Sequence, residues 1–160
     1  MKTFTTKELK EELINCSPAE MLEICLRLAK SKKENKELLT YLLFESSDEL
    51  SYIKNIKTEI DEQFSLINKS SYYLIKKSTR KILLNIKKYI RFSKNKETEV
   101  ELLLYFCDKL KHFKPSIHKN TRLVNLYEGQ IDLIRKKLTS LHEDLQYDYG
   151  VLLDALNKQI

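Results

Sequence analysis

The stretch SSYYLIKKSTRKILLNIKKYIRFSKNK, residues 70–96, decides the fold class because it has the two unlike sides of a surface helix. At about 100° per residue, apolar side chains gather on one side and Lys and Arg on the other. The apolar side consists of Ile75, Ile82, Leu83, Ile86, Tyr89 and Ile90. This spacing predicts an amphipathic helix that packs on a core through those residues.

The rest of the chain has the composition of a helical protein. Only two Gly and two Pro occur in 160 residues, although turns and hairpins of strand-rich folds depend on these residue types. Hydrophobic residues at 42% and charged residues at 32% are typical of a folded chain. We therefore predict one all-α domain over residues 1–160, with six to eight antiparallel helices.

Capping patterns divide the chain into helices. Boxes of Ser or Thr followed three residues later by Glu are predicted at Thr5–Glu8, Ser17–Glu20, Ser31–Glu34, Ser46–Glu49 and Ser140–Glu143. The predicted helices cover residues 6–15, 18–30, 33–45, 48–68, 71–92, 97–113, 121–142 and 144–158. An unbroken helical spacing of apolar residues from Tyr127 to Leu145 equally allows the last two to form one long helix.

Three segments are apolar nearly all round, namely 21–29, 38–44 and 100–107, and are predicted to be central and buried. A shift of 62 residues also lays 31–44 over 93–106, which favours a stacked, HEAT-like or α-solenoid arrangement. An irregular helical bundle is the alternative. The stacking resembles HEAT-type repeat proteins in architecture alone, since no motif of that family is present and no residue roles are carried over.

Positive charge is concentrated in one segment. Residues 1–62 hold ten Lys or Arg and thirteen acids, and residues 97–160 hold nine and ten. Residues 63–96 hold ten Lys or Arg and no acid, so the net charge of +6 arises there. We predict an anion- or partner-binding row on a helix at about 69–94, formed by Lys69, Lys76, Lys77, Arg80, Lys81, Lys87, Lys88, Arg91 and Lys94.

Two interpretations of this row remain open. Acids on neighbouring helices would neutralise it, or water alone would solvate it. Alternatively, the row is a docking face, because a helix selected for stability alone would alternate charges of opposite sign.

The leading functional hypothesis is a non-catalytic interaction module that binds an acidic protein partner. Sequence-independent binding to a nucleic-acid backbone is the alternative, with Tyr72, Tyr73 and Phe92 as candidates for stacking on bases. Of these, Tyr72 and Phe92 are expected to be partly buried, because aromatic residues at helical spacing usually belong to a core. No helix-turn-helix, zinc-finger, RRM or KH signature is present, so any such contact would go to phosphates.

A small helical enzyme is the third hypothesis. We expect no catalytic residues and no cofactor, because no nucleophile and base form a readable pair and two glycines cannot build a phosphate loop. The acidic segment 142–148 contains His142, Asp144 and Asp148, which are possible metal ligands. We expect no metal, since Glu143 and Asp144 also suit a helix N-terminus.

Three cysteines without C-x-x-C spacing indicate a reducing, cytoplasmic location. The longest apolar run, Leu102 to Cys107, is far shorter than a membrane-spanning helix, so no membrane partner is expected. The N-terminus lacks the apolar core of a secretory signal. The stripe from Tyr127 to Leu145 predicts packing within the domain, or alternatively a homodimer seam.

Overall fold

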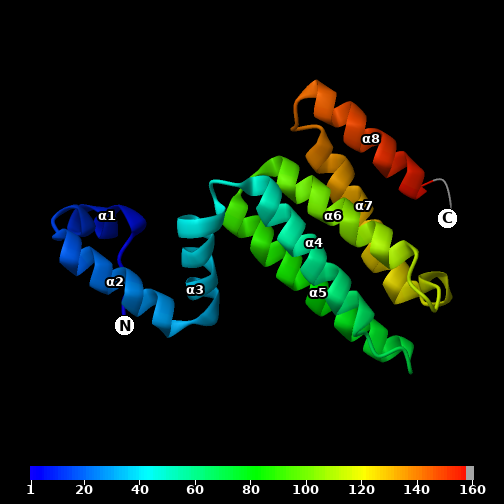
Figure 1. The fold of residues 1–160 in the computed structure, drawn as a ribbon, viewed down its shortest axis with the longest axis horizontal. Helices are drawn as coiled ribbons and strands as arrows, with labels where there is room; N and C mark the ends of the chain where they lie inside the picture. Colours follow the sequence, from blue (N-terminus) through cyan, green and yellow to red (C-terminus); the bar gives the residue numbers. More distant parts are fainter. Residues whose placement is uncertain (158–160) are drawn as a thin grey trace. The chain divides into compact units, whose positions relative to one another are not determined.

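The computed structural model describes residues 1–157, which form eight α-helices and no strand. The helices are α1 (Thr6–Ile14), α2 (Pro18–Ser31), α3 (Lys33–Thr40), α4 (Glu49–Ser65), α5 (Tyr72–Ser93), α6 (Lys96–Lys111), α7 (Thr121–Leu138) and α8 (Glu143–Asn157). A π-helical turn, Tyr41–Glu45, follows α3, and a 3-10 turn, Ile117–Lys119, precedes α7. The all-α prediction is confirmed (Figure 1).

The chain divides into two compact units, and each is described by itself. The first unit, Met1–Phe44, contains α1, α2 and α3. The second unit, Glu45–Ile160, contains α4 to α8. The single-domain organisation and the HEAT-like repeat stay predictions.

Helix starts agree with the sequence where the capping box is complete. The hydroxyls of Thr5 and Ser17 each accept a hydrogen bond from the backbone N–H three residues on. In return, the carboxylates of Glu8 and Glu20 accept the backbone N–H of Thr5 and Ser17. The predicted boxes at Ser31 and Ser46 are wrong. The Ser31 hydroxyl donates to the carbonyl of Leu28, and Asp48 caps α4 because its carboxylate accepts the N–H of Ser51 at 3.0 Å.

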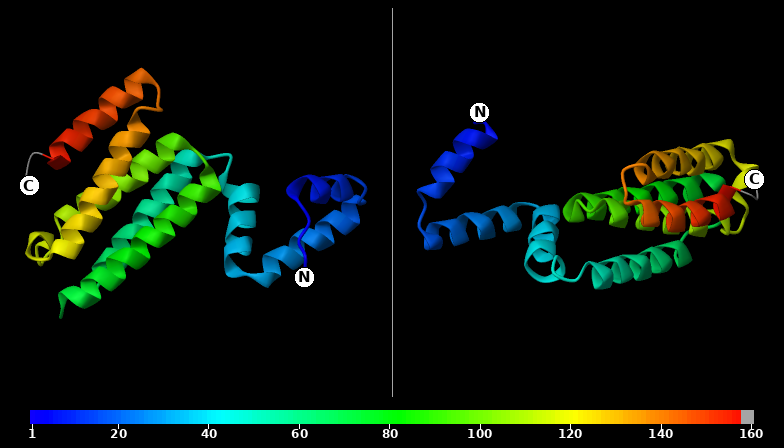
Figure 2. Two further views of the ribbon diagram at one scale, coloured as in Figure 1. Left: turned by 180° about the vertical axis from the view of Figure 1, so that it is seen from behind. Right: turned by 90° about the horizontal axis from the view of Figure 1, so that it is seen from above.

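Helix α6 lies at the centre of the second unit, where it packs against α4, α5, α7 and α8 (Figures 1 and 2). Its side chains Leu102, Phe106 and Leu110 have no exposed surface. The segment 100–107 is therefore central and buried except at Glu101 and Tyr105, as its apolar composition predicts. Phe64 of α4 packs against Phe106 with ring centroids 5.8 Å apart.

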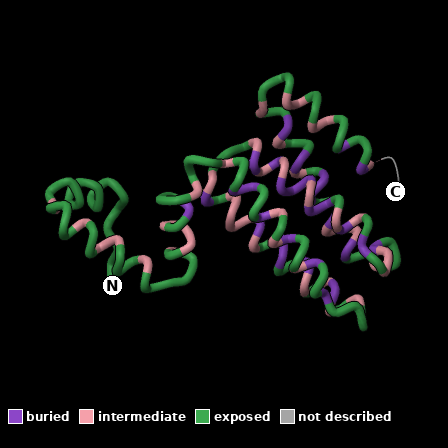
Figure 3. The backbone as a smooth tube through the Cα atoms, viewed as in Figure 1, coloured by how far each residue is buried: buried purple, intermediate pink, exposed green. Residues whose placement is uncertain are grey.

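The first unit differs from the prediction, because segments 21–29 and 38–44 are not buried throughout. Every residue of 1–40 is exposed or half-buried, and Tyr41 alone in this unit is buried (Figure 3). Leu43 and Phe44 are exposed by 65% and 75%. An apolar helix is buried on all sides only when neighbours surround it. Within the first unit, α2 has only two other short helices to cover it.

The break between α7 and α8 is real, so the alternative of one long helix is wrong. Helix α7 ends at Leu138, and α8 begins at Glu143. The stripe from Tyr127 to Leu138 is buried in its own unit, where α7 packs on α6 and α8. The predicted homodimer seam at Tyr127–Leu145 therefore has no support, since its central residues already contact their own chain.

Candidate functional site: the basic face of α5

Helix α5 buries the side that the sequence assigns to the core. The Ser71 hydroxyl caps its first turn, and Lys94 ends it in the left-handed conformation with φ 56°. Ile75, Ile82, Leu83 and Ile86 are at most 5% exposed, while Tyr89 and Ile90 are half-buried. The opposite side of α5 is therefore the surface on which the cations lie.

The structure places seven of the nine predicted cations on α5, namely Lys76, Lys77, Arg80, Lys81, Lys87, Lys88 and Arg91. Lys94 is the residue after the last turn. Lys69 lies in the loop before α5, with its ammonium 5.1 Å from the centre of the Phe113 ring. The helical spacing that grouped Lys69 with the row therefore does not apply to it.

Several ion pairs of the second unit engage cations outside the row. Within residues 45–157, carboxylates pair with Lys57, Lys109, Arg135 and Lys137, and two histidines approach neighbouring aspartates. The ammonium of Lys88 lies 4.7 Å from the centre of the Tyr89 ring. In the middle of the row, no carboxylate of residues 1–157 forms an ion pair with Lys77, Arg80, Lys81 or Lys87.

An exposed leucine lies at the centre of the row. Leu84 is 67% exposed, and the positions three, four and seven residues away on either side are its helical neighbours. All six are cationic: Lys77, Arg80, Lys81, Lys87, Lys88 and Arg91. We call this surface, together with Lys76, the basic face. The arrangement follows from helical spacing in the sequence, whereas the exposure of Leu84 follows from the fold.

One end of the basic face opens into a hollow that also involves α7. Tyr73 and Lys76 of α5, with Lys119 and Arg122 near the start of α7, line it. Partial burial, and then the positive charges of Arg122 and Arg80, lower the pKa of Lys76. An anion in the hollow would be attracted by these positive charges and would favour the charged form of Lys76.

The aromatic residues near the face have different roles. Tyr72 is half-buried, and its hydroxyl donates to the carbonyl of Ser116 at 2.9 Å. Phe92 is 7% exposed and packs edge-on against Tyr89. Tyr73 is 66% exposed, with its ring centre 5.6 Å from the Lys76 ammonium. Of these three aromatic residues, Tyr73 is therefore the one whose ring is exposed, and the expected burial of Tyr72 and Phe92 is confirmed.

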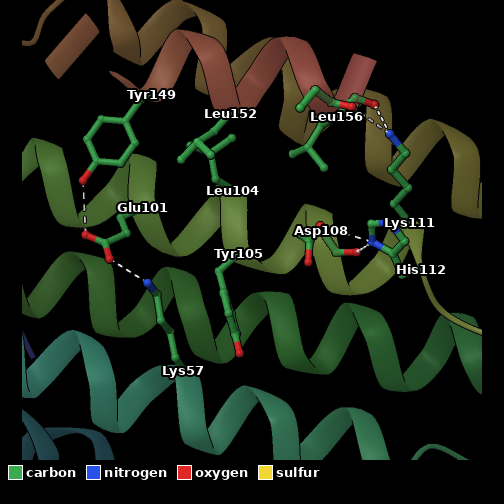
Figure 4. A pocket seen from close by; sticks show the side chains of 11 residues that line it. Lys57, Glu101, Leu104, Tyr105, Asp108, Lys111, His112, Tyr149, Leu152 and Leu156 are labelled. Atoms are coloured by element: carbon green, nitrogen blue, oxygen red, sulfur yellow. Dashed lines mark hydrogen bonds and ion pairs between the residues drawn. The ribbon is translucent and has the colours of Figure 1, made fainter. Parts of the chain in front are cut away.

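A separate cavity of about 470 Å³ lies among α4, α6 and α8 (Figure 4). Leu104, Leu152 and Leu156 form its apolar part. Its charged groups already have partners within the cavity. Lys57 pairs with Glu101 at 2.6 Å, and Tyr149 donates to the same carboxylate at 3.2 Å.

At the other end of this cavity, the charged groups also have partners. The Lys111 ammonium donates to the carbonyl of Leu156 at 2.6 Å, and Nδ1 of His112 lies 3.1 Å from the carboxylate of Asp108. The polar groups of the cavity therefore join α4 to α6 and α6 to α8. The expectation that the chain is not an enzyme stays a prediction.

Residues 1–157 offer neither a metal-binding cluster nor a membrane-spanning helix. No cluster of three or more His, Cys, Asp or Glu side chains is arranged to hold a metal ion. At 142–148, Nδ1 of His142 lies 3.5 Å from the carboxylate of Asp144. No helix in the described part of the chain combines the length and apolarity needed to cross a membrane.

Comparisons with known proteins give no match: no family model fits this chain, and no curated protein or solved structure matches it.

Proposed function

We propose that the chain is a non-catalytic interaction module whose basic face binds an acidic protein partner with an apolar anchor. The observation that carries this proposal is Leu84, which is 67% exposed and has cations at all six neighbouring helical positions. In recognition of an amphipathic helix, apolar anchors at helical spacing fix the register, and Leu84 would offer an apolar contact for such an anchor in the middle of the cations. Carboxylates flanking that anchor would meet the surrounding cations.

Electrostatics favours this class of partner. Neighbouring cations on α5 repel one another, and an acidic partner would replace that repulsion with attraction. Charged groups at the rim of an interface mainly raise the association rate and make it depend on salt. The leucine in the middle would supply the part of the affinity that salt does not screen.

Nucleic-acid backbone binding is the second candidate, favoured by the exposed ring of Tyr73 beside the Lys76 ammonium. Phosphates would use the cations of the face and Tyr73 would stack on a base. Phosphates would gain no favourable contact from the apolar side chain of Leu84. Removal of Leu84 alone therefore distinguishes the two classes of partner.

The test measures binding of two probes across a salt series. One is a helical peptide with leucines flanked by glutamates, and the other is single-stranded DNA. Leu84→Ser should weaken peptide binding about tenfold and leave DNA binding unchanged. Leu50→Ser is the matched control, because Leu50 is 80% exposed on α4 and outside the basic face. Equal loss for both leucine variants would contradict the proposal.

A charge reversal tests the cations themselves. The variant Lys76→Glu, Arg80→Glu, Lys87→Glu should abolish binding of the acidic peptide at low salt. The control Lys54→Glu, Lys114→Glu, Lys136→Glu changes the net charge equally at exposed positions outside the face. If both triple variants lose the same affinity, net charge and not the basic face is responsible.

The proposed setting is the cytoplasm. Cys16, Cys25 and Cys107 are free thiols, and unpaired cysteines are ordinary in a reducing compartment. Burial of Cys107 and half-burial of the other two fit a role as small apolar side chains.

A further inference from the structure

Helix α2 has a second apolar stripe that its own unit does not cover. Met21, Ile24 and Cys25 lie on one side and are half-buried. On the adjoining side of the helix, Leu22 and Leu26 are 61% and 45% exposed. With Ala19, Glu23, Arg27 and Lys30, these two leucines line a shallow open groove. We call this surface the outer stripe of α2.

Charge along the outer stripe changes sign from one end to the other. Glu23 precedes Leu26, while Arg27 and Lys30 follow it. The same order extends over the unit, since residues 5–23 hold five acids and two Lys, and residues 24–40 hold five Lys or Arg and two acids. A surface of this kind is complementary to itself when a second copy runs in the opposite direction.

We propose that the outer stripe of α2 binds the same stripe of a second copy in an antiparallel, two-fold symmetric contact. A two-fold axis level with the midpoint between residues 24 and 25 brings Leu22 of one copy to within one residue of the level of Leu26 of the other. The same axis brings Glu23 to within one residue of the level of Arg27, and each contact occurs twice. A parallel pairing would instead set acids against acids and bases against bases.

The proposed occupant is a second copy, because the acidic end of one stripe would face the basic end of the other at both ends of the contact. A purely acidic partner would meet Glu23, and a purely basic one would meet Arg27 and Lys30. One helical stripe buries less than the roughly 800 Å² per partner of a standard stable interface. The dimer is therefore weak and depends on concentration. This surface lies in the first unit and is independent of the basic face.

Sedimentation velocity of the full chain over a concentration series tests the proposal without any partner. The native chain should shift from monomer to dimer with rising concentration. Glu23→Lys alone, or Arg27→Glu alone, should raise the dissociation constant about tenfold, because either variant creates two like-charge contacts. An equimolar mixture of the two variants should dimerise as the native chain does. In the mixed dimer, the lysine introduced at position 23 of one copy meets the glutamate introduced at position 27 of the other.

The mixture separates the interface from damage to the helix. A variant that had merely lost helix α2 would not recover when mixed, and circular dichroism of each variant checks its helix content. Glu62→Lys on α4 is the control for charge, and it should leave the dissociation constant unchanged. The double variant Leu22→Ser, Leu26→Ser should remain monomeric throughout.

Three outcomes would overturn the proposal. The native chain could stay monomeric at every concentration, which would mean that another segment of the same chain covers the stripe. The serine variant could dimerise unchanged, which would place self-association elsewhere. The mixed charge variants could fail to recover, which would exclude the antiparallel register.

Discussion

Lys76 of α5 and Arg122 of α7 line the same hollow, although they lie far apart in the sequence. Partial burial and the charge of the arginine lower the pKa of the lysine. Two helices thus contribute cations to one end of the basic face, and their charges act on each other through the fold.

The pairing predicts how Lys76 titrates. Arg122→Gln should raise the pKa of Lys76 part of the way towards its ordinary value. The positive charge that lowers this pKa most is then removed, while the effect of partial burial remains. A pH titration of the Lys76 side chain by NMR measures this. Lys136→Gln, at an exposed position of the same helix, should have no effect. An unchanged pKa in Arg122→Gln would show that the two charges do not interact.

Cys107 should be the unreactive thiol. Burial, with a smaller contribution from the charge of Asp108, raises its pKa to about 12, and the thiolate is the reactive form. A thiol reagent should modify the half-buried Cys16 and Cys25 in the native chain and Cys107 only after unfolding. Modification of all three at one rate would contradict the burial of Cys107.

The raised pKa of Cys107 also predicts a pH dependence. Its folded thiol stays neutral, so its contribution to stability is complete below the unfolded value of about 8.5. That contribution is lost as the pH rises from there towards 12. The difference in free energy of unfolding between the native chain and Cys107→Ala should therefore shrink over this interval. A constant difference from about pH 7 to about pH 10 would refute this assignment.

Lys111 should stabilise the docking of α8. Its ammonium donates to the carbonyls of Ala155 and Leu156 in the last turn of that helix. A cation at a helix C-terminus is favourable, so Lys111→Met should lower the free energy of unfolding by about 1 kcal/mol. Urea denaturation measures the loss. Lys114→Met, at an exposed loop position, should cost much less.

The core prediction concerns α6. Leu110→Ala should lower the free energy of unfolding by about 2–5 kcal/mol, because Leu110 has no exposed surface and the deletion leaves a cavity. Leu50→Ala is the control, since Leu50 is 80% exposed. Similar losses for the two variants in urea denaturation would mean that α6 is not the centre of the core.

Local features of the fold could be predicted from the sequence because local interactions fix them. The boxes at Thr5 and Ser17 depend on residues three apart, and both form. Helix α4 begins at Glu49, within one residue of the predicted start at 48, but its cap is Asp48 and not Ser46, because Asp48 directly precedes the first helical residue. The exposure of Leu22 could not be predicted, since it depends on which neighbours cover α2.

The candidate site likewise contains residues that helical spacing places and residues that only the packing places. The cations of α5 follow from helical spacing, and Leu84 could have been found by the same projection. Arg122 could not, because only the packing of α7 brings it beside Lys76. Lys69 was misplaced because the helix begins at Tyr72, three residues after it.

The most direct test of the docking face is a double-mutant cycle between Leu84 and the central leucine of the acidic peptide. Affinity is measured for the native pair, for Leu84→Ser, for the peptide with serine at its anchor, and for both together. The account predicts a coupling free energy of about 0.5–3 kcal/mol, because the two leucines touch. Additive losses, or no binding of the acidic peptide at low salt, would contradict it.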